Sequence, residues 1–142
     1  MKKIYVCQIC GHIAFDSAPV NCPVCNAPQN QFKEDPEAIM PAEKEGKEKH
    51  IPQIIVTKEC GLIPGLCHDI HIKVGTIPHP MTEDHLIQWL DVYVNKVFTA
   101  HYMFTPQTQA ALSVHLKTDL SGTITVIIHC NKHGNWIAEA PL

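Results

Sequence analysis

Two Cys-x-x-Cys pairs close to the N-terminus limit what this chain can fold into more than any other feature of the sequence. The pairs are Cys7–Cys10 and Cys22–Cys25, with eleven residues between them. Two such pairs can place four thiolates around one tetrahedral metal ion, and both iron and zinc accept that ligand set. Two disulfides are the alternative. We therefore expect residues 1–35 to form a small domain built around a metal.

Composition narrows the class of protein. The 142 residues include seven cysteines, 45% hydrophobic residues and no arginine, and the formal net charge is −3. Nucleic-acid-binding surfaces are normally rich in arginine, so nucleic acid is not an expected partner. The start Met-Lys-Lys lacks the apolar stretch of a signal peptide, and no apolar run is long enough to span a membrane. We expect a cytoplasmic protein, where cysteines bind metals more often than they form disulfides.

The cysteine-rich part is followed by a change in composition. Residues 36–49 mix acidic and basic side chains with Pro36, Pro41 and Gly46, which is the composition of a solvated linker. Residues 50–142 then form the predicted main domain.

The main domain has the sequence pattern of a β protein. Three segments alternate apolar with polar residues, as half-buried strands do; they are 69–74, 112–117 and 123–130. β-branched and aromatic residues over 86–98 predict one long strand. Residues 118–122 have the composition of a hairpin loop. The domain is therefore predicted to be mainly β, an antiparallel β-sandwich.

Five residues of the main domain could reach a single metal ion. His79 and His85 bracket a turn that leads into a strand, while Cys130 ends an apolar strand and His133 follows within a loop. His50 stands where the linker meets the domain. Four imidazoles and one thiolate are too many ligands for structural zinc, and they suit a redox iron with one open position. A single thiolate on Fe(II) leaves a net charge of about +1, which favours an anionic substrate.

The N-terminal residues resemble a known domain. Tyr5-Val-Cys-Gln-Ile-Cys-Gly-His, Cys22-Pro-Val-Cys-Asn-Ala-Pro and Phe32 are similar to the rubredoxin-like domains attached to rubrerythrins. The resemblance implies an electron-transfer centre of iron and four cysteines, and we favour iron over zinc. His12 is expected to pack beside the centre.

The main domain resembles the superoxide reductase family, which includes desulfoferrodoxin and neelaredoxin. The motifs are Glu48-Lys-His-x-Pro, His79-Pro-Met with a second histidine six residues after the first, and Cys130-Asn-x-His-Gly-x-Trp, within residues 46–137. The resemblance implies an immunoglobulin-like sandwich. It also implies iron held in a plane by four histidines with an axial cysteine; these ligands are His50, His79, His85, His133 and Cys130.

The same resemblance implies a reaction, which is the one-electron reduction of superoxide to hydrogen peroxide. Lys49 is expected to attract the anion and assist its protonation, and Glu48 to occupy the open position in the oxidised resting enzyme. A rubredoxin-type protein or its reductase is the implied electron donor, and a homo-oligomer, dimer or tetramer, is expected. Desulfoferrodoxins usually have adjacent final cysteines in their first domain, whereas Cys22 and Cys25 are separated here. An electron carrier with two iron centres and no substrate, or a structural or regulatory zinc protein, are the rival interpretations.

Several reactive side chains are left without a role. Cys60 and Cys67 flank a predicted hairpin loop and are expected to be free thiols in a reducing compartment. Lys47 and Lys132 are expected to be solvated charges that add to a local positive field. No chemistry is assigned to the remaining histidines of the main domain, which are His68, His71, His101, His115 and His129.

Overall fold

The structure is a computed structural model that describes residues 3–58, 60–117 and 119–142. It contains two compact units, of which the first ends at Ile39 and the second begins at Met40. The segment predicted to be a linker, residues 36–49, spans this boundary. Its second part is folded: the Met40 N–H donates to the Asn135 carbonyl (2.8 Å), and a helical turn, α1, covers Lys47–His50.

The first unit is a small antiparallel sheet with strand order β2-β1-β3. Its strands are β1 (Ile4–Cys7), β2 (Ile13–Phe15) and β3 (Phe32–Glu34), and a short 3₁₀ helix, η1, covers Gln29–Gln31. Two similar turns carry the cysteine pairs. The Gly11 N–H donates to the Cys7 carbonyl and the Asn26 N–H to the Cys22 carbonyl, both at 2.8 Å. Gly11 and Asn26 have positive φ (85° and 65°), a conformation that glycine and asparagine adopt most readily.

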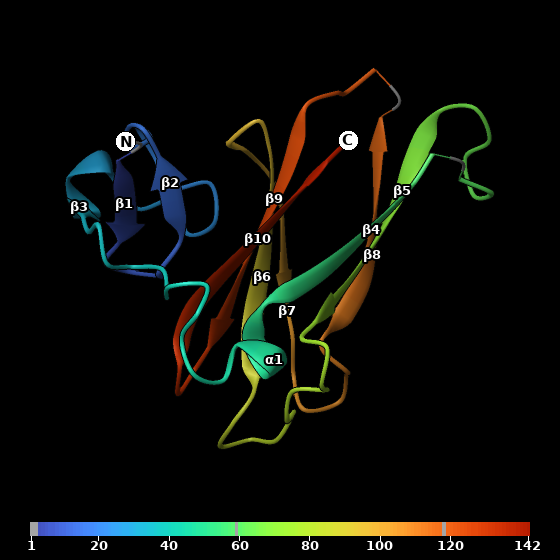
Figure 1. The fold of residues 1–142 in the computed structure, drawn as a ribbon. Helices are drawn as coiled ribbons and strands as arrows, with labels where there is room; N and C mark the ends of the chain where they lie inside the picture. Colours follow the sequence, from blue (N-terminus) through green and yellow to red (C-terminus); the bar gives the residue numbers. More distant parts are fainter. Residues whose placement is uncertain (1–2, 59, 118) are drawn as a thin grey trace. The chain divides into compact units, whose positions relative to one another are not determined.

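The second unit is a β-sandwich of two antiparallel sheets (Figure 1). One sheet has the order β10-β9-β6-β7 and the other β4-β5-β8. The strands are β4 (Pro52–Thr57), β5 (Cys67–Val74), β6 (Ile87–Val94), β7 (Val97–Met103), β8 (Ala111–Lys117), β9 (Thr123–Cys130) and β10 (Gly134–Pro141). The predicted fold class is confirmed.

The core lies between the two sheets and follows the alternation of the strands. In β5, Ile70, Ile72 and Val74 are at most 3% exposed, whereas His71 and Lys73 between them face solvent. Central strands of the other sheet are buried on nearly every residue, as in β6 and β9. All three alternating segments were correctly predicted as strands, and those of β5 and β8 have one buried face, whereas β9 is buried on both faces.

Two predicted connections were wrong. The segment 86–98 is not one strand, because Asn95 and Lys96 turn the chain with φ of 52° and 66° and make β6 and β7 a hairpin. β-branched residues on both sides of this tight turn hid it from a propensity argument. The segment 118–122 does not close a hairpin either: β8 pairs with β5, whereas β9 pairs with β6 and β10. Thr118 lies outside the described residues.

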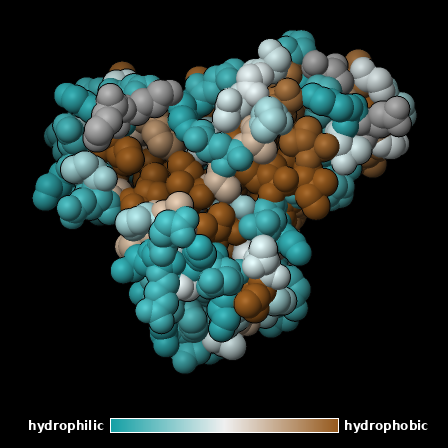
Figure 2. All heavy atoms as spheres, viewed as in Figure 1, coloured by the Kyte–Doolittle hydropathy of each residue, from teal (hydrophilic) through white to brown (hydrophobic). Residues whose placement is uncertain are grey.

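The two ends of the sandwich carry different features. α1 and the loops after β5 and β9 lie at one end, and the loop between β4 and β5 lies at the other (Figure 1). In Figure 2, hydrophilic side chains cover the end that carries α1. Among the described residues, no helix is long and apolar enough to cross a membrane.

Candidate metal centres

The five predicted ligands of the main domain come together at the α1 end of the sandwich. His50 is the last residue of α1, Cys130 is the last residue of β9, and His133 lies in the turn before β10. His79 and His85 lie in the connection between β5 and β6. Ligand atoms of His50, His85, Cys130 and His133 are all within 4.8 Å of one another. The Nε2 atom of His79 is 3.2 Å from Nε2 of His50.

The four imidazoles form a closed ring. Centroids of neighbouring rings are 4.8 Å apart for His50–His79 and His79–His85, 5.2 Å for His85–His133 and 5.1 Å for His50–His133. Each neighbouring pair meets edge to face, at interplanar angles of 69° to 76°. Four imidazoles in this arrangement can turn one nitrogen each toward a common centre.

Hydrogen bonds select the nitrogen that two of the rings offer. Nδ1 of His50 contacts the Gly46 carbonyl and Nδ1 of His79 contacts the Pro80 carbonyl, both at 2.7 Å. A carbonyl can only accept, so Nδ1 carries the proton and Nε2 is left as a metal ligand. His133 instead turns Nδ1 toward the Cys130 Sγ atom, at 3.7 Å. The Trp136 ring stacks on His50 with centroids 4.7 Å apart and fixes that ring from the side.

The electrostatic surroundings of His50, His79 and His85 favour their neutral form. Burial lowers the pKa of His79 to about 4 and also lowers the pKa values of His50 and His85. The neighbouring imidazoles act in the same direction, and so does the positive charge of Lys49 on His50 and His85. Only neutral imidazole binds a metal, so these three rings are ready to do so near neutral pH.

Backbone contacts hold α1 against the loop that leads to His79. The Gly75 N–H donates to the Ile51 carbonyl and the Ile77 N–H donates to the Glu48 carbonyl, both at 3.0 Å. Gly75 has φ of +81°, and a Cβ atom there would lie 2.6 Å from the Glu48 carbonyl oxygen. A glycine is therefore required for α1 to lie this close.

A second clamp joins the His85 segment to the loop after Cys130. The Asn131 side chain accepts the Leu86 N–H (3.1 Å) and donates to the Asp84 carbonyl (3.0 Å). The Trp136 indole N–H donates to the His133 carbonyl at 3.1 Å. Asn131 and Trp136 occur in the sequence motif, but their positioning roles could not be read from spacing.

The two residues predicted to act on the substrate, Glu48 and Lys49, lie in α1 and are exposed. The Lys49 charge acts on His50 and His85, and the Lys132 charge acts on His85. Two lysines thus place positive charge at the imidazole ring. Lys47 in contrast pairs with Glu43 at 2.8 Å.

In the first unit, the four predicted cysteines also converge. Sγ atoms are 3.6 Å apart for Cys7–Cys25 and for Cys10–Cys22, and all four lie within 4.8 Å of one another. Burial raises the pKa of Cys10 and Cys22. A bound cation would allow all four cysteines to be thiolates at this separation.

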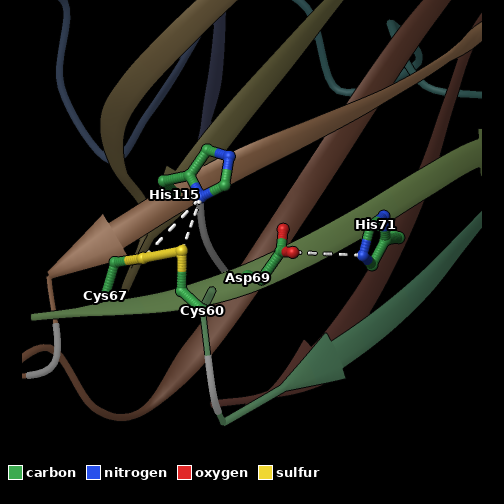
Figure 3. Close-up of a disulfide and its surroundings, with 5 residues drawn as sticks. All are labelled: Cys60, Cys67, Asp69, His71 and His115. Carbon is green, nitrogen blue, oxygen red and sulfur yellow. Dashed lines mark hydrogen bonds and ion pairs between the residues drawn. A yellow bond between two sulfur atoms is a disulfide. The ribbon is translucent and has the colours of Figure 1, made fainter. Parts of the chain in front are cut away.

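The remaining cysteines differ from expectation. Cys60 and Cys67 are joined by a disulfide, so the prediction of free thiols was wrong. The antiparallel pairing of β4 with β5 brings the ends of their loop together, which spacing alone could not establish. His115, to which no chemistry was assigned, lies beside both sulfur atoms (Figure 3). Other histidines have structural partners: His101 pairs with Asp91, and His129 stacks on Trp89.

Comparison with known proteins decides the family. A desulfoferrodoxin profile matches residues 42–139, and a profile for the rubredoxin-like domain of rubrerythrin matches residues 5–33. The chain belongs to the desulfoferrodoxin family. The desulfoferrodoxin of Syntrophotalea carbinolica is 29% identical over 140 residues, covering 96% of this chain and 95% of that relative.

Relatives of this desulfoferrodoxin-family chain also include proteins named superoxide reductase. The one from Pyrococcus abyssi is 31% identical over 106 residues, which cover 67% of this chain and 88% of that relative. Among solved structures, a superoxide reductase (neelaredoxin) from Ignicoccus hospitalis has a TM-score of 0.58 at 27% identity. That match covers 71% of this chain and 88% of the other.

The desulfoferrodoxin family has an iron centre, and the donor set of the main domain fits one. Imidazole and thiolate ligands suit iron. Nε2 of His85 is buried and makes no hydrogen bond to any described residue. A buried polar atom without a partner costs free energy. A metal ion bound among the four imidazoles would give the Nε2 atom of His85 a partner.

Proposed function

We propose that this chain is a superoxide reductase, which adds one electron and two protons to superoxide and releases hydrogen peroxide. The observation that carries the proposal is the closed ring of four imidazoles with the Cys130 sulfur in the same cluster. His50, His79, His85, His133 and Cys130 are the proposed ligands. When bound, iron supplies the electron and a Lewis-acid position for the anion.

The chain contributes charge and protons at this site. Lys49 and Lys132 make the exposed side of His85 positive, and such a field raises the encounter rate with an anion by about 10 to 1,000-fold. We propose Lys49 as the group that attracts superoxide and passes a proton to the product. Glu48, which precedes it in α1, is the carboxylate proposed to cover the site between turnovers.

The two units of the chain have different proposed roles. We propose that residues 1–35 hold iron on four cysteines and receive electrons from a rubredoxin-type protein or its reductase. Residues 50–142 hold the reacting iron, and residues 36–49 connect the two. The convergent cysteine sulfurs of the first unit support this proposal.

The stoichiometry of the reaction tests the proposal. Iron-loaded protein with an excess of reductant should give one hydrogen peroxide for each superoxide consumed, without oxygen release. A dismutase would give one peroxide for every two superoxide ions and would release oxygen. An electron carrier would leave superoxide to decay at its uncatalysed rate, and zinc as the only metal in the main domain would also contradict the proposal.

A variant identifies the contribution of the thiolate. Serine oxygen is a harder and poorer electron donor than a thiolate. Cys130→Ser should therefore lose the visible charge-transfer absorption of the iron and most of the superoxide-reducing activity. An unchanged spectrum and turnover would show that Cys130 is not a ligand.

A further inference from the structure

A second sulfur and imidazole cluster lies at the opposite end of the sandwich from the proposed iron site. Cys67 is the first residue of β5, and Cys60 precedes it by seven residues in the loop from β4. The length of β5, from Cys67 to Val74, corresponds to about 23 Å at 3.3 Å per residue. The loop that carries His79 follows Val74, at the other end of β5 from Cys67. The Cys60–Cys67 disulfide is therefore separate from the proposed iron site.

The imidazole of His115 contacts both sulfur atoms of the disulfide. Its Nδ1 atom lies 3.1 Å from Sγ of Cys60 and 3.7 Å from Sγ of Cys67 (Figure 3). Both cysteines are only 4% exposed, while His115 faces solvent. His115 therefore covers the sulfur pair, and it stands closer to Cys60.

The strand pairing adds a carboxylate. Asp69 lies directly opposite His115 in the β5–β8 register, so both side chains are on the outer face of that sheet. Asp69 Oδ2 is 3.3 Å from Nε2 of His71, and Asp69 Oδ1 makes no hydrogen bond to any described residue. The pairing therefore places a carboxylate beside the His115 imidazole on the outer face of that sheet.

We propose that Cys60 and Cys67 are a reversible dithiol–disulfide pair, and that His115 is a positioning residue that stabilises the Cys60 thiolate. A disulfide that only links two strands needs no imidazole on its sulfur atoms. An imidazole beside a cysteine favours the thiolate, and a thiolate that is stabilised leaves a disulfide faster. The shorter distance assigns this role to Cys60.

The reaction is thiol–disulfide exchange with an external dithiol. A thiolate of the dithiol bonds to the Cys67 sulfur, the bond between Cys60 and Cys67 breaks, and Cys60 leaves as a thiolate beside the His115 N–H. The second thiolate of the dithiol then attacks the mixed disulfide and releases Cys67. The protein gains two electrons and two protons, and the dithiol becomes a disulfide. The reverse sequence closes the pair again.

The test measures the redox equilibrium of the folded, full-length protein in buffers of graded reduced and oxidised glutathione. Alkylation followed by peptide mass spectrometry reports the free thiol fraction at positions 60 and 67, while circular dichroism reports the fold. We expect reversible opening without unfolding. His115→Ala should shift the equilibrium about tenfold toward the disulfide, which corresponds to about 30 mV for this two-electron couple, and should slow reduction.

Two further variants make the result specific. His71→Ala removes an exposed imidazole from the same sheet face. The His71 ring contacts Ser113 and Asp69 but neither sulfur atom, so this variant should leave the equilibrium unchanged. His115→Gln, which keeps a hydrogen-bond donor, should restore part of the shift and guards against misfolding of the alanine variant.

Three results would overturn the proposal. The disulfide could open only when the protein unfolds, which would make it structural. His115→Ala could match the parent protein in both equilibrium and rate. Finally, the reduced protein could hold one metal ion more than Cys60→Ser/Cys67→Ser and resist oxidation, which would make the cluster a metal site. None of these measurements depends on superoxide turnover, so they leave the proposed function untouched.

Discussion

The four imidazoles of the proposed iron site are not held equally. His50 and His79 are buried, and each is anchored by a backbone carbonyl on Nδ1. His133 is exposed, and His85 is partly exposed with its Nε2 atom buried. The ring therefore has a fixed inner side and a more accessible outer side. The positive charges of Lys49 and Lys132 act on His85, which lies on the accessible side.

Lys49→Ala tests the use of this charge. We expect roughly three- to tenfold slower capture of superoxide at low salt, with a weaker dependence on ionic strength and unchanged iron content. Lys47→Ala is the matched control, because Lys47 lies in the same helical turn but is paired with Glu43. Pulse radiolysis of the pre-reduced protein at several salt concentrations measures the capture rate. Equal rates for both variants and the parent would make Lys49 a solvated surface charge.

The lowered pKa of His79 predicts how the iron-free protein responds to acid. Its value falls from 6.5 in the unfolded chain to about 4 in the fold because of burial. Between these values the unfolded state binds a proton that the folded state does not, so stability falls as the pH drops from about 6.5 toward 4. Urea unfolding of iron-free protein at pH 7 and pH 5 measures the loss. In His79→Gln the loss should be smaller, and an equal loss would exclude His79 as its source.

At the scale of elements, the sequence predicted strands better than their connections. Alternation over 69–74 correctly identified the inner and outer faces of β5, because burial of one face imposes a period of two. The turn at Asn95–Lys96 was missed, since two non-glycine residues adopt positive φ there. Alternation also cannot tell whether successive strands pair, so the crossing from β8 to β9 was read as a hairpin.

The proposed iron ligands could be predicted and their supports could not. The five side chains could be proposed as ligands because histidine and cysteine are chemically distinctive, and a motif resemblance links them across the chain. The Asn131 side chain binds backbone groups of Asp84 and Leu86, and α1 approaches the backbone of Gly75, so neither contact has a partner that is distinctive in the sequence. Likewise, the contact of His115 with the disulfide depends on strand register, which no local pattern specifies.

Gly75→Ala tests whether the approach of α1 sets the iron site. A side chain at φ of +81° costs about 1–2 kcal/mol, and its Cβ atom would also collide with the Glu48 and Ile77 carbonyl oxygens. We expect α1 to shift and His50 to hold iron less firmly, seen as faster loss of iron to a chelator. Gly65→Ala is the control, because Gly65 has φ of +75° with no atom within 4 Å of the added Cβ. Similar rates of iron loss in both variants would show that backbone strain, and not the collision with α1, causes the loss.

At the scale of the whole molecule, the chain combines two units with separate cores. The first is built around the buried Cys7 and Cys22, and the second around the apolar faces of its two sheets. Every proposed ligand of the reacting iron belongs to the second unit. All described residues of its core cluster lie within that unit, so it should fold when the first is removed.

A truncated chain that begins at Pro36 tests this separation. It keeps Met40, which anchors the start of the second unit to Asn135, together with Glu48, Lys49 and His50. Once reduced, it should bind one iron and consume one superoxide per chain at close to the full-length rate, because the first unit supplies no ligand. Re-reduction by a rubredoxin-type donor should be slower, since the four-cysteine centre is absent.

The full-length variant Cys22→Ser separates loss of that centre from loss of the polypeptide. It keeps every residue of the first unit except one proposed metal ligand, so it should match the truncated chain in slow re-reduction and the parent in single-turnover rate. Rapid mixing with superoxide measures the single turnover, and anaerobic mixing with reduced donor measures the return of the electron. Unchanged re-reduction in both proteins would show that electrons reach the second unit directly. A truncated chain that folds and binds iron but cannot consume one superoxide when reduced would place part of the active site in the first unit.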